Sequence, residues 1–155
     1  MSGQSMYWMH SMQSRLNDRA NWPSGSWDHE PDRVEWIHQG IPCLMTRGGF
    51  GAWCGYAGVR PDHPLYGVPF DAPIMTTLDV HGNLTYSFKC HEHICHDAPG
   101  DDVWWLGFDC GHALDVAPGL ETLLGREYPP IGTYKDLEYV RAEVNSLAEQ
   151  LHDLR

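Results

Sequence analysis

The chain carries little positive charge, which excludes one large class of partner. Two lysines and eight arginines stand against 21 acidic residues among 155, and the formal net charge at pH 7 is −11. A protein that binds nucleic acid directly needs a basic surface to displace the counterions of the phosphates. We therefore expect no direct nucleic acid binding. An acidic surface instead suits solubility, metal ions or a basic protein partner.

Long apolar runs are also missing. No segment approaches the roughly 20 apolar residues that a membrane-spanning helix needs, and the opening MSGQSMYWMHSMQSR has no continuous apolar core of the kind found in a secretory signal. We therefore expect no membrane association and a cytoplasmic location. Cysteines are kept reduced in that compartment, so metal binding or burial is the expected role of the five cysteines.

Familiar catalytic motifs are absent as well. The sequence contains no P-loop, no dinucleotide-binding fingerprint, no HExxH zinc-protease motif and no Gly-x-Ser-x-Gly nucleophile elbow. Whether the protein is an enzyme is therefore left open by the sequence.

The patterns that are present predict a single α+β domain over residues 33–155. Residues 1–32 are polar and are interrupted by Pro23 and Gly25, which indicates an N-terminal arm that is irregular or forms a short helix. From residue 33 the alternation of apolar and polar residues predicts a mostly antiparallel, twisted sheet of five to six short strands. The expected strands span residues 34–39, 41–46, 50–59, 74–80, 83–89 and 103–109.

Two of the predicted elements are distinctive. The segment 103–108 is apolar on both alternating faces, which predicts a central strand covered on both sides. A C-terminal helix with Thr133 as its N-cap is expected to pack one apolar stripe on one face of the sheet, in a monomer or a homodimer. The residues of the stripe are Leu137, Val140, Val144, Leu147, Leu151 and Leu154.

The stretch from His81 to His112 concentrates the candidate metal ligands. It holds three of the five cysteines and five of the ten histidines. Thiolate and imidazole are the ligands that hold zinc tetrahedrally, and a closed set of four is typical of a structural site. We therefore predict a small acidic, zinc-binding protein. The predicted ligands are Cys90, Cys95, Cys110 and His112, with His93 and His96 as alternates.

A hydrolase is the first alternative. An open metal site would keep one coordination position for water, and Asp109 or Glu92 would orient a ligand or act as the general base. Such a site would use three of His81, His91, His93, His96 and His112. Without a metal, Cys110 would be the nucleophile, with His112 or His81 as its base and Asp109 orienting that base.

An acidic inhibitor of a basic host protein is the second alternative. Charge complementarity would speed the association, and some of the seven tryptophans could supply binding hot spots. Exposure of Trp22, Trp27 or Trp36 would favour this class, and their burial would count against it.

Several short motifs resemble one known family. They are Gly55-Tyr56, the segment 63–67 (HPLYG), 81–85 (HGNLT), 104–112 (WWLGFDCGH) and 134–140 (YKDLEYV). The chain is similar over roughly residues 50–155 to small uncharacterised proteins of bacteriophages, prophages and actinobacterial genomes that share a WWxGFDCxH motif. The resemblance implies an origin in a mobile element and brings no catalytic residues. Asn83 and Leu114 stand where that family has glycine.

Overall fold

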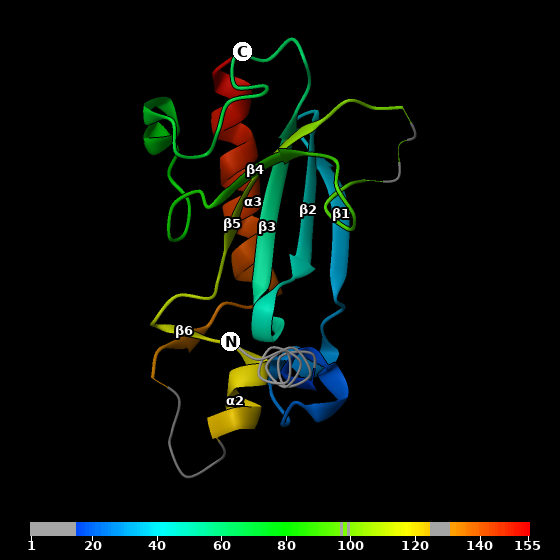
Figure 1. The fold of residues 1–155 in the computed structure, drawn as a ribbon, viewed down its shortest axis with the longest axis vertical. Helices are drawn as coiled ribbons and strands as arrows, with labels where there is room; N and C mark the ends of the chain where they lie inside the picture. Colours follow the sequence, from blue (N-terminus) through cyan, green and yellow to red (C-terminus); the bar gives the residue numbers. More distant parts are fainter. Residues whose placement is uncertain (1–14, 97, 99, 125–130) are drawn as a thin grey trace, which may run out of the picture.

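The computed structural model describes residues 15–96, 98, 100–124 and 131–155. Its main sheet is antiparallel, with five strands in the order β1-β2-β3-β5-β4, as Figure 1 shows. The strands are β1 (Arg33–His38), β2 (Ile41–Arg47), β3 (Trp53–Val59), β4 (Tyr86–Lys89) and β5 (Trp104–Asp109). The predicted α+β domain, with a mostly antiparallel sheet and a helix packed on one face, is confirmed. Strand β5 is interior, between β3 and β4, and the middle of the sheet is β3.

One predicted hairpin is wrong. Residues 74–80 were expected to pair with 83–89, but Pro73–Thr77 form the 3-10 helix η4 instead. Pro73 stands at its start, where a fixed φ and a missing N–H cost nothing, and Met75 is buried in the core. Strand β4 consequently pairs with β5, with Tyr86 opposite Gly107.

Helix α3 (Leu137–Asp153) covers one face of the sheet, where it contacts β3 and β2. In Figure 1 it runs beside and behind β3. Its buried side chains are Val140, Val144, Leu147, Ala148 and Leu151. The N-cap is Asp136, whose carboxylate accepts a hydrogen bond from the Tyr139 amide at 2.8 Å, whereas the expected cap Thr133 belongs to strand β7. Among the described residues, no helix combines the length and the apolar character that crossing a bilayer requires.

The opposite face of the sheet is covered by the loop that follows β4. Trp105 and Leu44 on this face are fully buried, and Cys90 and Ile94 of the loop pack against their cluster. Cys90 and Cys95 form a disulfide, which corrects the expectation that the cysteines serve only metal binding or burial. Figure 1 shows this loop reaching toward β1, where Arg33 donates hydrogen bonds to the carbonyls of His93 and Cys95.

A second, two-stranded sheet lies beyond the end of β5. Strand β6 (Asp115–Val116) pairs in parallel with β7 (Thr133–Tyr134). The short helix α2 (Pro118–Leu124) follows β6 and contacts the 3-10 helix η1 (Arg19–Asn21). This second sheet brings the start of α3 next to the segment after β5.

The described part of the N-terminal segment, from residue 15 onward, packs against the rest of the domain. Residues 15–17 are helical, η1 is followed by a second 3-10 helix, η2 (Ser26–His29), and Trp27 of η2 is buried edge-on against Tyr134. The earlier part of the predicted arm, residues 1–14, lies outside the described residues.

A largely buried ion pair ties this segment to the rest of the domain. The Glu30 carboxylate pairs with Arg47 at 3.2 Å and accepts hydrogen bonds from the Tyr134 hydroxyl and, at 2.6 Å, from the Leu137 amide at the start of α3. The guanidinium of Arg47 also lies 3.9 Å from the ring centre of Trp53. One carboxylate therefore joins the N-terminal segment, β2, β7 and α3.

We expect Glu30→Gln to lower the free energy of unfolding by about 3 kcal/mol, because removing one partner of a largely buried ion pair leaves Arg47 with only the exposed carboxylate of Asp32. Urea denaturation followed by tryptophan fluorescence measures it. The matched control is Glu35→Gln, which breaks the more exposed pair with Arg33 and should change stability by no more than about 0.5 kcal/mol. Equal effects of the two substitutions would contradict the role assigned to Glu30.

Candidate metal centre

The structure does not bring the four predicted zinc ligands together. Cys90 and Cys95 are bonded to each other over one face of the sheet. Cys110 is buried in the cluster on the other face, which includes Phe108 and Val144 of α3. Successive residues of a strand point to opposite faces, so the sheet itself separates the disulfide from Cys110.

The histidines of the 91–96 loop also lie apart from His81 and His112. His91 and His93 are exposed. The ring of His96 packs edge-on against Trp105, at 5.5 Å between ring centres. Of the five histidines considered for an open metal site, only His81 and His112 take part in a cluster of potential ligands within the described part of the chain.

Cys110 does not have the surroundings of a nucleophile. Its side chain is buried, and burial raises the pKa of the thiol far above its ordinary value, with a further contribution from the nearby carboxylates of Asp115 and Asp109. The thiolate is the reactive form of cysteine, and this environment keeps the thiol protonated. Cys110 is thus a core residue at the end of β5.

The residues that do come together are His81, His112 and Asp115. His81 Nε2 lies 2.8 Å from Asp115 Oδ2, and His112 Nδ1 lies 3.2 Å from the same oxygen. One ligand atom from each residue falls within 4.8 Å of the others. The three side chains come from a turn, from the segment after β5 and from β6, and together they could hold a metal ion.

Local backbone geometry brings the two imidazoles together. Gly82 and Asn83 form a turn with φ of +67° and +66°, a conformation that glycine and asparagine tolerate best. The His112 ring packs directly on Gly82, where a Cβ atom would come within 2.2 Å of the ring carbon Cε1. On the other side, the Asp115 amide donates to the His112 carbonyl at 2.9 Å and closes a tight turn.

Asp115 is the buried anchor of this cluster. Burial raises the pKa of its carboxyl, but hydrogen bonds from His81, the His112 amide and Lys135 outweigh burial and lower the pKa to about 2. The two carboxylate oxygens have different partners. Oδ2 faces both histidines, whereas Oδ1 lies 3.0 Å from Lys135 Nζ. Lys135 therefore neutralises Asp115 without occupying the oxygen that the histidines share.

The second nitrogen of each histidine also has a neighbour. His81 Nδ1 lies 2.9 Å from the Tyr139 hydroxyl, and His112 Nε2 lies 3.5 Å from Asp109 Oδ1. Burial, followed by the charge of Glu143, raises the pKa of Tyr139 to about 12, so the hydroxyl keeps its proton. Oxygen partners of this kind orient metal-binding imidazoles in known sites.

Sequence reasoning found His81, His112 and Asp109 but missed Asp115, Lys135 and Tyr139. A local signal existed for Asp115, because it follows His112 by three residues in a turn-forming segment. No local signal existed for Lys135 and Tyr139, which are about 20 or more residues away and arrive through the pairing of β7 with β6 and the start of α3.

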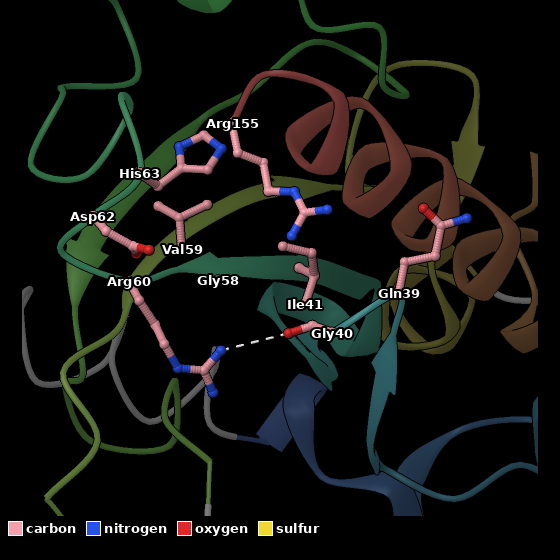
Figure 2. Close-up of a pocket in the computed structure, with 9 residues that line it drawn as sticks. All are labelled: Gln39, Gly40, Ile41, Gly58, Val59, Arg60, Asp62, His63 and Arg155. Carbon is pink, nitrogen blue, oxygen red and sulfur yellow. Dashed lines mark hydrogen bonds between the residues drawn. The ribbon is translucent and has the colours of Figure 1, made fainter.

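A second candidate site is a pocket at the far end of the sheet, shown in Figure 2. Several of its polar groups already have partners. Both ring nitrogens of His63 are hydrogen-bonded, to the Leu151 carbonyl and the Leu65 amide, and Arg60 pairs with Asp101. His63 thus fixes the proline-rich loop to α3, and the pocket offers less chemistry than the histidine cluster.

The depressed pKa of Asp115 predicts a pH dependence. The carboxyl has a pKa of about 2 in the folded protein against 3.8 in the unfolded chain, so its contribution of about 2 kcal/mol is present above pH 4 and is lost as pH falls toward 2. Urea denaturation in the presence of a chelator measures the difference in unfolding free energy between wild type and Asp115→Asn. This difference should shrink by about 2 kcal/mol between pH 5 and pH 2. A constant difference for Asp115→Asn would contradict the assigned pairing.

No protein-family model matches the chain, and no similar protein was found among curated proteins or among solved structures. The resemblance to phage and prophage proteins therefore stays a prediction.

Proposed function

We propose that the protein binds one divalent transition-metal ion through His81 Nε2, His112 Nδ1 and Asp115 Oδ2. The observation that carries this proposal is the convergence of both imidazoles on a single oxygen of a buried carboxylate. Zinc is the ion we propose, because two histidines and one carboxylate are a common zinc ligand set. The same set also suits Fe²⁺.

Two of the three distances between the ligand atoms suit an ion. With metal–ligand bonds of about 2.1 Å, neighbouring ligand atoms lie roughly 3.0–3.4 Å apart. The two distances to Asp115 Oδ2, 2.8 and 3.2 Å, are within a few tenths of an ångström of that range. Lys135 supports this arrangement, because its hold on Oδ1 leaves Asp115 to bind through Oδ2 alone.

A metal-dependent hydrolase is the second candidate, and one observation favours it. The His112 side chain is 41% exposed, whereas that of Asp115 is 3% exposed, so the cluster is reached by solvent from the His112 side. Three protein ligands leave a position for water, and a bound zinc ion would lower the pKa of that water. Asp109, next to His112 at the exposed side, is the carboxylate placed to orient this ligand.

The alternative of an acidic inhibitor relied on exposed tryptophans as binding hot spots, and none of the three named tryptophans is exposed. Trp27 is buried, and Trp22 and Trp36 are half-buried. The indole nitrogen of each donates a hydrogen bond within the chain, to Pro23, Leu16 and Asn145 respectively. These side chains are therefore packed within the protein, which counts against their use as an interaction surface.

Metal binding is tested by titrating zinc into oxidised protein that has been treated with chelator and then freed of it. We expect one equivalent to bind and to raise the melting temperature, because an ion that binds only the folded state stabilises it. His112→Ala removes an exposed ligand and should weaken zinc binding by at least about 100-fold. Even substitution of residues that only hydrogen-bond to metal ligands lowers metal affinity by 10–100-fold. His38→Ala is the control, because His38 pairs with Glu149 outside the cluster. Equal zinc uptake by the two variants would contradict the site.

The contact between Gly82 and the His112 ring gives an independent prediction. Gly82→Ala should weaken zinc binding at least about tenfold, because the added methyl group displaces the ring of a ligand. Gly40→Ala is a matched control, since Gly40 has a similar positive φ of +79° and nothing within 4 Å of its would-be Cβ. Both variants should lose about 1–2 kcal/mol of stability from backbone strain, but only Gly82→Ala should lose affinity in the zinc titration. Unchanged affinity in Gly82→Ala would show that the ring position does not matter.

A further inference from the structure

We propose that reduction of the Cys90–Cys95 disulfide creates a second metal site, in which the two thiolates and His96 bind a thiophilic divalent ion such as zinc. This site shares no residue with the cluster around Asp115 and lies over the opposite face of the sheet. Its existence therefore does not depend on the function proposed above.

The loop that carries the two sulfurs is held by more than the disulfide. The His91 amide donates to the Ile94 carbonyl at 3.2 Å, and the Ile94 amide donates back to the His91 carbonyl at 3.0 Å. Arg33 from β1 donates to the His93 carbonyl at 2.5 Å and to the Cys95 carbonyl. Because these bonds remain after reduction, the two thiols stay neighbours rather than separating.

The Trp105 side chain connects the third ligand to this pair. Trp105 Nε1 donates to Cys90 Sγ at 3.5 Å, and the ring of His96 packs on the same indole at 5.5 Å between ring centres. His96 also follows Cys95 directly in the chain. Cys90 Sγ and the His96 ring thus both contact one buried aromatic side chain.

One nitrogen of His96 lacks a directed hydrogen bond. Its Nε2 atom is buried and, among the described residues, has no hydrogen-bond partner. The nearest carboxylate oxygen, Asp101 Oδ2, lies 3.2 Å from this nitrogen, within ion-pair distance. A buried polar atom without a partner is rare and calls for an explanation. A metal ion would supply a directed partner for Nε2. Solvent would supply the fourth ligand, because Arg60 engages both carboxylate oxygens of Asp101.

The chemistry balances in two steps. A dithiol reductant gives two electrons and two protons to the disulfide and is itself oxidised to a disulfide, so that Cys90 and Cys95 become thiols. Binding of the divalent ion then releases both thiol protons, because the thiolate is the ligand. Two thiolates neutralise the ion, which suits a half-buried position on an acidic protein. In a reducing compartment the thiol form would be the populated one.

The test compares zinc uptake by oxidised and reduced full-length protein. A phosphine reductant, oxidised to the phosphine oxide as water supplies its oxygen, is used and removed without air before titration. We expect reduced protein to bind one equivalent more than oxidised protein, and cobalt in place of zinc to give a thiolate-to-cobalt absorption band. Cys90→Ser should abolish the additional equivalent. His96→Ala should weaken it at least about tenfold, while the matched control His93→Ala, in the same loop but exposed, leaves it unchanged.

Equal zinc stoichiometry in the two redox states would overturn the proposal, as would an additional equivalent that survives Cys90→Ser. Loss of the near-ultraviolet tryptophan signal on reduction would also overturn it, because the loop contacts are expected to hold without the disulfide. Titration of the oxidised protein alone reports on the cluster around Asp115. Failure of one site is therefore distinguished from failure of the other.

Discussion

Strand β5 is apolar on both faces, so both sides of the sheet have to be covered. Leu106 and Phe108 point to the side of α3, and Val103 and Trp105 point to the side of the disulfide loop. A single helix can cover only one of these faces. The loop after β4 covers the other, and this requirement explains why a short irregular segment rich in cysteine and histidine is so well anchored.

Because both faces of the sheet are covered, the potential metal ligands of the chain fall into two groups on opposite sides of it. Cys110 and the cluster around Asp115 belong to the side of α3 and the end of β5, whereas Cys90, Cys95 and His96 belong to the loop on the other side. Ligands that are close in the sequence therefore form two groups rather than one. The buried sheet between them is the physical reason that a single site of three cysteines and one histidine is not assembled.

The cluster around Asp115 illustrates how a buried charge organises its surroundings. A carboxylate removed from water is tolerated only when cations or hydrogen-bond donors compensate it. Lys135 takes one oxygen, and the histidines with the His112 amide take the other. The division leaves one oxygen shared by two imidazoles at the solvent-facing side, which is the feature that makes the cluster suitable for a metal ion.

Short-range patterns in the sequence were sufficient to predict the overall architecture. The alternation in 103–108 and the 3,4 spacing from Leu137 to Leu151 predicted an interior strand and a covering helix, because period and burial are coupled within one element. Composition similarly indicated His81 to His112 as the stretch of interest. The predicted hairpin at 74–80 failed, because a run of apolar residues after a proline fits a buried 3-10 helix as well as a strand.

Only the tertiary structure decided which side chains meet. Asp115 and Lys135 are joined by the parallel pairing of β6 with β7, and Tyr139 arrives with the first turn of α3. Cys90 bonds to Cys95 rather than joining Cys110, because the strand between them turns its side chains to opposite faces. The sequence by itself determined the elements and the kinds of ligand. Their grouping depended on contacts between distant segments, since the position of each ligand is set by packing and not by its neighbours in the chain.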